Sequence, residues 1–151
     1  HPSKEEENLR FIERISEVVQ RGGTALVPAF ANGRTQDVVM LLHKHLPHLD
    51  VHVDGMGKRV AKLQMEHPET LRDPAALEAA WSWCRRVSSK SDRKKALDAD
   101  VIVSTCILFS FSAAVFKDDG ILCKGVVFLQ LEHTARTFLP RLLNGINAIW
   151  K

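Results

Sequence analysis

The sequence has 151 residues, of which 45% are hydrophobic, and this size and composition suit one ordinary domain with a core of its own. Its 21 basic and 18 acidic residues give a net charge of only +3, so a polyanionic partner is indicated only where basic residues cluster. Three cysteines, Cys84, Cys106 and Cys123, are too few and too widely spaced for a disulfide framework or a metal knuckle. No apolar run approaches the roughly 20 residues of a membrane span, and no secretory leader is visible, so we expect a soluble, cytoplasmic protein without membrane contact.

The first half of the chain alternates helical and strand-like patterns. Leu9, Ile12, Ile15 and Val19 recur at helical spacing and predict an amphipathic helix over residues 4–21, which the Gly22-Gly23 pair ends. The predicted elements that follow are a strand over residues 24–29, a helix over 35–46, a strand at 51–53, and a helix that restarts near Val60 and ends at Pro68.

The second half continues this alternation. A run of helix formers predicts a helix from Pro74 to Val87, with a further turn at 93–97. Strand-length apolar runs follow at 101–106 and 126–130, separated by a helix-sized segment at 113–116. The alternation predicts a single α/β domain over residues 1–151, built as a three-layer, open, mostly parallel sheet with helices on both faces.

Ligands of open parallel sheets usually bind beyond the carboxyl ends of the strands. The loops expected at those ends cover residues 30–34, 54–59, 106–112 and 131–137. A glycine-rich dinucleotide fingerprint follows none of the strands, which disfavours a small-nucleotide-binding domain.

Two of these loops carry candidate phosphate ligands. Arg34 and Thr35 begin a predicted helix, where free amides, the helix dipole and a guanidinium can bind a phosphate. Lys58 and Arg59 occupy a comparable turn after Asp54, which could orient one of them, and we expect them to share a groove with Arg34. The alternatives are a capping Thr35 and charged side chains that are simply solvated.

The densest charge lies in residues 85–95, where six of eleven residues are basic. Arg85, Arg86, Arg93 and Lys94 in this run could bind the phosphates of a nucleic acid without sequence preference. A solvated helix surface is the alternative explanation of the same run.

Other residues indicate contact surfaces more than chemistry. Trp81 and Trp83 stand two apart on a predicted helix, so one of them is expected to be exposed, either at a protein interface or stacked on a base. His43 and His45 suggest a metal site only superficially, because residues two apart on a helix point to different faces. We expect no metal ligands in this chain.

Three blocks of the sequence resemble the β-CASP domain of RNase J-like and cleavage-and-polyadenylation-type nucleases. They are KEEENLRFIERISEVVQRGG, TALVPAFANGRTQDVVMLL and VHVDGMGKRVAKL, in the family's order and spacing. The segments ADVIVST and FLQLEHTARTFLPRLL are similar to later blocks. The loop at residues 106–112 departs from the family's glycine-rich pattern and offers Phe109 and Phe111 as apolar contact residues instead.

The resemblance implies a Rossmann-like domain inserted in a metallo-β-lactamase host, whose HxHxDH block binds the family's zinc. That block is not in this sequence, so we expect a chain without a cofactor or catalytic residues of its own, inactive when isolated. The predicted function is to bind the backbone of RNA, or of another single-stranded nucleic acid, as part of RNA processing. The alternative is a protein-interaction or dimerisation module, whose partner is a second copy or the missing host domain.

Overall fold

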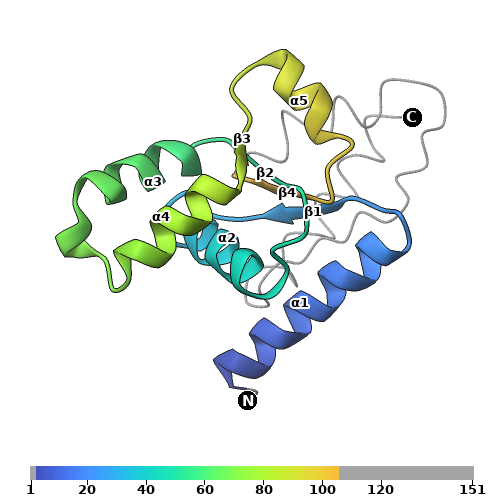
Figure 1. The fold of residues 1–151 in the computed structure, drawn as a ribbon, viewed down its shortest axis with the longest axis horizontal. Helices are drawn as coiled ribbons and strands as arrows, with labels where there is room; N and C mark the ends of the chain where they lie inside the picture. Colours follow the sequence, from blue (N-terminus) through green and yellow to red (C-terminus); the bar gives the residue numbers. More distant parts are fainter. Residues whose placement is uncertain (1–2, 106–151) are drawn as a thin grey trace, which may run out of the picture.

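The computed structural model describes residues 3–105, which contain a four-stranded, all-parallel sheet with the strand order β1-β4-β2-β3 (Figure 1). The strands are β1 (Ala25–Pro28), β2 (Val51–Asp54), β3 (Arg85–Arg86) and β4 (Val101–Ser104). β4 lies between β1 and β2, because Val101 is in register with both Ala25 and Val51. The predicted strand over 126–130 and the helix at 113–116 lie outside the described residues, and the prediction of one domain over residues 1–151 extends beyond them too.

Helices cover both faces of the sheet. They are α1 (Lys4–Gln20), α2 (Arg34–His45), α3 (Gly57–Glu66), α4 (Pro74–Trp83) and α5 (Lys90–Ala96), with a short 3-10 helix η1 (Pro68–Thr70). Figure 1 shows α5 above the sheet and α1, α2 and α4 below it. The predicted fold class, a three-layer α/β structure with a parallel sheet, is confirmed.

Alternate residues of each strand point to opposite faces, and the two faces differ in what they bury. Val27, Val53 and Val103 join a large apolar core with residues of α1, α2, α3 and α4. Leu26 and Ile102 face the other way and, among the described residues, form a small cluster with Val87 and Ala96 under α5. We call these two sides the helical face and the α5 face.

Helix α1 shows how the apolar pattern fixes one of these faces. Ser3 and Glu6 form a reciprocal capping box at its first turn, which satisfies amides that have no partner inside the helix. The buried residues are Phe11, Ile12, Ile15 and Val18. The predicted apolar face was therefore placed slightly wrongly, since Leu9 is 53% exposed and Phe11 and Val18 are buried against the core.

The helix predicted from Pro74 to Val87 is too long. Helix α4 ends at Trp83, and Cys84 adopts an extended conformation that turns the chain into β3. Arg85 and Arg86 then pair in parallel with His52 and Val53. Two exposed arginines carry no strand pattern, so this strand is dictated by its neighbour β2 rather than by its own sequence.

The connections after β2 and β3 leave the sheet toward opposite faces. β2 leads into α3, whose Ala61 joins the core of the helical face, whereas β3 leads into α5 on the other side. In open α/β sheets, ligands usually bind outside the carboxyl ends of adjacent strands whose connections diverge in this way. We call this position, beyond the ends of β2 and β3, the β2–β3 crevice. The ends of β2 and β3 therefore position the candidate site.

Candidate nucleic-acid interface

Asp54, the last residue of β2, brings together two of the predicted phosphate ligands. Its side chain is only 6% exposed, and its Oδ2 lies 3.2 Å from Nη2 of Arg93 on α5. Its Oδ1 lies 3.5 Å from Nζ of Lys58 on α3. Lys58 also donates a hydrogen bond to the carbonyl of Val87, just after β3. One carboxylate thus links the first turn of α3 to α5 across the β2–β3 crevice.

The loop after Asp54 has a conformation that depends on glycine. Gly55 has φ of +90°, and a Cβ at this position would clash with Oγ1 of Thr105. That Oγ1 accepts a hydrogen bond from the amide of Met56 at 2.8 Å, which ties the loop to the end of β4. Asp54 Oδ1 accepts a further hydrogen bond from the Gly55 amide at 2.7 Å. The hydrogen bond from the Gly55 amide therefore orients the carboxylate independently of Lys58 and Arg93.

The cluster keeps a surplus of positive charge and of hydrogen-bond donors. Asp54 balances one of the two cations, Lys58 and Arg93, and leaves one formal charge. An ammonium and a guanidinium carry more N–H groups than these contacts use. Nε of Arg93 is buried without a hydrogen-bond partner among the residues that the structure describes. A phosphate oxygen is a suitable acceptor for such groups.

Helix α5 carries further basic residues beside Arg93 in the sequence. Ser89 and Asp92 form a capping box, with Asp92 also accepting from the Ser88 amide at 3.1 Å. The hydrogen bonds from Ser88 and Ser89, with a smaller effect of Lys95, hold the pKa of Asp92 below its usual value. Lys94 is exposed next to Arg93, as Arg59 is next to Lys58. We call Lys58, Arg59, Arg93 and Lys94 the edge cluster.

Arg34 and Thr35 differ from what their positions in the sequence predict. Thr35 is fully buried, and both its hydroxyl and its amide donate to the carbonyl of Phe30. The Arg34 amide donates to the carbonyl of Asn32 at 3.0 Å. These amides are therefore already used by the loop itself, and Gly33, not Thr35, is the N-cap residue of α2.

The buried Thr35 and Gln36 join the loops that follow β1 and β2. A Cβ on Gly57 would lie 2.6 Å from Cγ2 of Thr35. Nε2 of Gln36 donates at 3.1 Å to the carbonyls of both Ala31 and Gly57. The sequence block around Arg34 thus holds two strand-end loops together. The sequence did not predict this role of Thr35 and Gln36, because their hydrogen-bond acceptors are backbone carbonyls, which every residue has.

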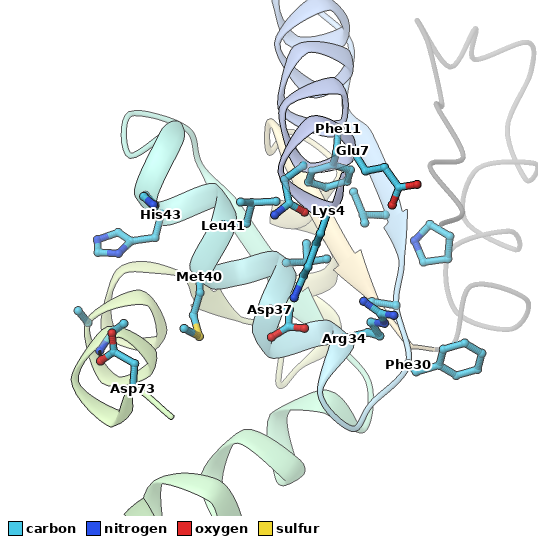
Figure 2. A pocket seen from close by; sticks show the side chains of 18 residues that line it. Lys4, Glu7, Phe11, Phe30, Arg34, Asp37, Met40, Leu41, His43 and Asp73 are labelled. Carbon is cyan, nitrogen blue, oxygen red and sulfur yellow. Dashed lines mark hydrogen bonds between the residues drawn. The ribbon is translucent and has the colours of Figure 1, made fainter. Parts of the chain in front are cut away.

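Arg34 lines a different part of the surface from the edge cluster. Figure 2 shows its side chain at a pocket of about 770 Å³ between α1 and α2, which extends along α2 toward Asp73 at the start of α4. The charged lining residues are Lys4, Arg34 and Lys44 against Glu7, Asp37 and Asp73, so the two signs balance. Lys58 turns instead to Asp54, and the single groove expected for Arg34, Lys58 and Arg59 is not what the structure shows.

The other two arginines of the basic run also bind within the protein. Nε of Arg85 lies 3.1 Å from Oδ1 of Asp50, at the amino end of β2. Nη1 of Arg86 donates to the carbonyl of Trp81 at 2.9 Å. The run at residues 85–95 is therefore divided: within the described part of the chain, Arg93 on α5 is the residue of this run that pairs with Asp54 at the end of β2.

The two tryptophans are less accessible than predicted. Trp81 is buried in the core of the helical face, and Trp83 is half-buried, with its indole donating to the carbonyl of Pro47 at 2.9 Å. The ring of His43 lies 5.2 Å from that of Trp83. The expectation that one tryptophan is exposed is wrong, because the bend after α4 lets both pack inward. Phe109 and Phe111 lie outside the described residues.

Among residues 3–105, no three His, Cys, Asp or Glu side chains come together in a way that could hold a metal.

Cys84 is buried, and burial raises the pKa of its thiol from 9.0 to about 11, although the nearby Arg86 opposes this rise. Within the same residues, no helix is long and apolar enough to cross a membrane.

Comparison with known proteins finds relatives among archaeal RNA enzymes and transcription factors. The chain is 32% identical over 146 residues to RNase aCSPSF2 of Saccharolobus solfataricus, which covers 95% of this chain and 30% of the relative. It is 34% identical over 98 residues to the probable RNase MJ4 of Methanocaldococcus jannaschii, covering 65% of the chain and 23% of the relative. The transcription termination factor FttA of the same organism is 26% identical over 149 residues, covering 89% of the chain and 22% of the factor.

These similarities support a relation to β-CASP-type nucleases. The chain spans less than a third of the length of each of the three relatives. No family model matches the sequence.

Proposed function

We propose that this chain is the β-CASP-like part of an RNA-processing nuclease and binds the phosphate backbone of RNA, while another part of the protein supplies the catalytic metal centre. The names of the relatives support a role in RNA processing. Their greater length supports a division of labour between this segment and the rest.

The observation that carries this proposal is the meeting of Lys58 and Arg93 at Asp54, in the crevice between β2 and β3. Two charges separated in sequence by a strand and two helices converge where this fold class binds ligands. A fixed pair of cations with unused donors suits a phosphate oxygen. The exposed Arg59 and Lys94 follow the two cations in the sequence and add positive charge to α3 and α5. Contacts of this kind bind backbone and carry no sequence preference.

The test is the salt dependence of binding to single-stranded RNA. The variant Arg59→Met/Lys94→Met removes the two members of the edge cluster that form no ion pair with any residue of the described range 3–105. We expect about tenfold weaker binding at low salt, and a slope of log K against log salt reduced by about 1.4, because each lost phosphate contact on a single strand contributes about 0.7.

The matched control is Arg10→Met/Lys62→Met, which removes the same charge from exposed positions of α1 and α3. It should bind within about twofold of wild type, since only general electrostatics changes. Equal losses in both variants, or none in either, would refute the edge cluster as the binding surface.

We also expect the chain alone to leave RNA intact with added zinc or manganese, and chelator-sensitive cleavage would contradict this.

A second candidate function, association with another copy of this chain, is favoured by one observation. Phe30, which lines the pocket on the helical face and is labelled in Figure 2, is 75% exposed. Aromatic residues are enriched at protein interfaces relative to the rest of the surface. Sedimentation of the wild type and of Phe30→Ser tests this candidate. Self-association that Phe30→Ser abolishes would support it, and a wild type that stays monomeric at high concentration would exclude it.

A further inference from the structure

Within residues 3–105, helix α5 makes few apolar contacts with the sheet. Only Ala96 of its seven residues is buried, where it meets Leu26, Val87 and Ile102. The other side chains of α5 are polar or charged. A short helix of this composition has little apolar surface with which to fix its own orientation.

Asp54 supplies the contact that the apolar residues do not. Its Oδ2 holds Arg93 at 3.2 Å, so the basic helix is connected to β2, and its Oδ1 faces Lys58 at 3.5 Å. The Gly55 amide donates a hydrogen bond to the same Oδ1 and so orients the carboxylate. Arg93 and Lys58 retain exposed fractions of 39% and 25%, so both can still meet a ligand from solvent.

We infer that Asp54 is a positioning residue for RNA binding: it holds Lys58 and Arg93 side by side as a two-cation clamp for one backbone phosphate. The inference rests on the proposed function. Long basic side chains lose much rotamer freedom when they bind, and a carboxylate that orders them beforehand removes part of that cost. A phosphate that enters the crevice then meets two cations already in place.

Positioning and simple charge balance predict opposite effects of removing Asp54. If only net charge mattered, Asp54→Asn would add one positive charge to the site and tighten RNA binding. If Asp54 positions the clamp, the loss of order outweighs the added charge. Asn keeps the size of Asp and an oxygen that can accept from the Gly55 amide, so the variant isolates the carboxylate charge.

The experiment measures single-stranded RNA binding at several salt concentrations for the wild type, for Asp54→Asn, and for the control Asp37→Asn. Asp37 is exposed in the first turn of α2 and lies at the pocket on the helical face. We expect Asp54→Asn to bind about threefold more weakly, with the salt slope reduced by about 0.7, the value of one phosphate contact on a single strand. Asp37→Asn should bind as wild type or slightly more tightly. Tighter binding by Asp54→Asn would overturn the inference.

A second measurement uses only the wild-type chain, and it tests the positioning role of Asp54 even if Asp54→Asn does not fold. In the free wild-type chain, the Nε–H group of Arg93 should show a heteronuclear NOE close to that of the folded backbone, because the clamp is ordered before RNA arrives. A value typical of a freely moving side chain would overturn the inference.

If Arg59→Met/Lys94→Met binds as wild type does, the proposed function fails. If that variant weakens binding but Asp54→Asn strengthens it, only the positioning role fails.

Discussion

The two faces of the sheet are held by different forces. On the helical face, residues such as Ile15, Leu42 and Val53 are fully buried among α1, α2, α3 and α4. On the α5 face, the described residues form an apolar cluster of only four, and the ion pair between Asp54 and Arg93 connects α5 to the sheet. Within residues 3–105, the helical face therefore buries most of the apolar surface, while the α5 face holds charged groups in place with little of it.

The largest expected effect comes from the helical face. Leu42→Ala should lower the free energy of unfolding by about 2–5 kcal/mol, because a fully buried leucine leaves a cavity in a packed core. Urea unfolding followed by circular dichroism measures this loss. The control Leu63→Ala changes an exposed leucine on α3 and should cost much less. Equal losses in the two variants would show that the helical face is not the stabilising side.

The buried thiol of Cys84 gives the same face a pH dependence. Its pKa is raised from 9.0 to about 11 in the folded chain, so the contribution is fully present below about pH 9 and is lost as the pH rises through 9 toward 11. At most about 3 kcal/mol should disappear, since a tenfold change in proton affinity corresponds to about 1.4 kcal/mol. Urea unfolding of wild type and Cys84→Ala on either side of this range isolates the thiol. The chain has no tyrosine to titrate there. A parallel pH dependence in both proteins would contradict the prediction.

The contrast between the faces also explains how much of the fold could be predicted from sequence. Apolar spacing predicted α1, α2 and β2 because hydrophobic burial determines them. It misplaced Leu9, which belongs to the same helical pattern but lies beyond the edge of the core. It also missed β3, whose two exposed arginines pair with β2 for reasons that lie in the partner strand.

A smaller effect is expected where α5 is attached. Arg93→Met removes one of the two cations at Asp54 and should cost about 1 kcal/mol, since the guanidinium is 39% exposed and solvent screens the pair. Hydrogen exchange should show that α5 opens more readily while α1 and α2 keep their protection. Lys62→Met, which breaks an exposed pair with Glu66, is the matched control and should be near neutral. Loss of protection throughout the sheet would mean that the two faces are not independent.

An effect of similar size is expected at the cap of α5. Ser89→Ala removes the hydroxyl that accepts from the Asp92 amide at 3.0 Å, and a lost N-cap costs about 1 kcal/mol. We expect the opening to remain local to α5, with RNA binding weakened slightly because Arg93 and Lys94 become less ordered. Hydrogen exchange and the RNA titration measure the two effects. RNA binding that tightens in Ser89→Ala would contradict the dependence of the clamp on α5.

The candidate site was only partly predictable. Lys58 and Arg93 were named from position and charge, and the sequence suggested that Asp54 might orient one cation, but their meeting at one carboxylate depends on the strand order. Thr35 was named for the same reasons as Lys58, yet it is buried because its hydroxyl finds a backbone carbonyl. The position of a residue in the fold indicates which side chains are candidates for ligand binding. Whether a candidate can bind a ligand depends on the hydrogen-bond acceptor that its side chain already contacts within the protein.

The most direct test of the account is to map bound RNA on the folded chain. Amide chemical shifts should be recorded while a short single-stranded RNA is added at low salt. We expect changes at Gly55, Lys58 and Arg93, in the β2–β3 crevice, and little change at Phe11, Val38 and Leu41 around the pocket of the helical face. Changes centred on that pocket, or none at the crevice under conditions where RNA binds, would contradict it.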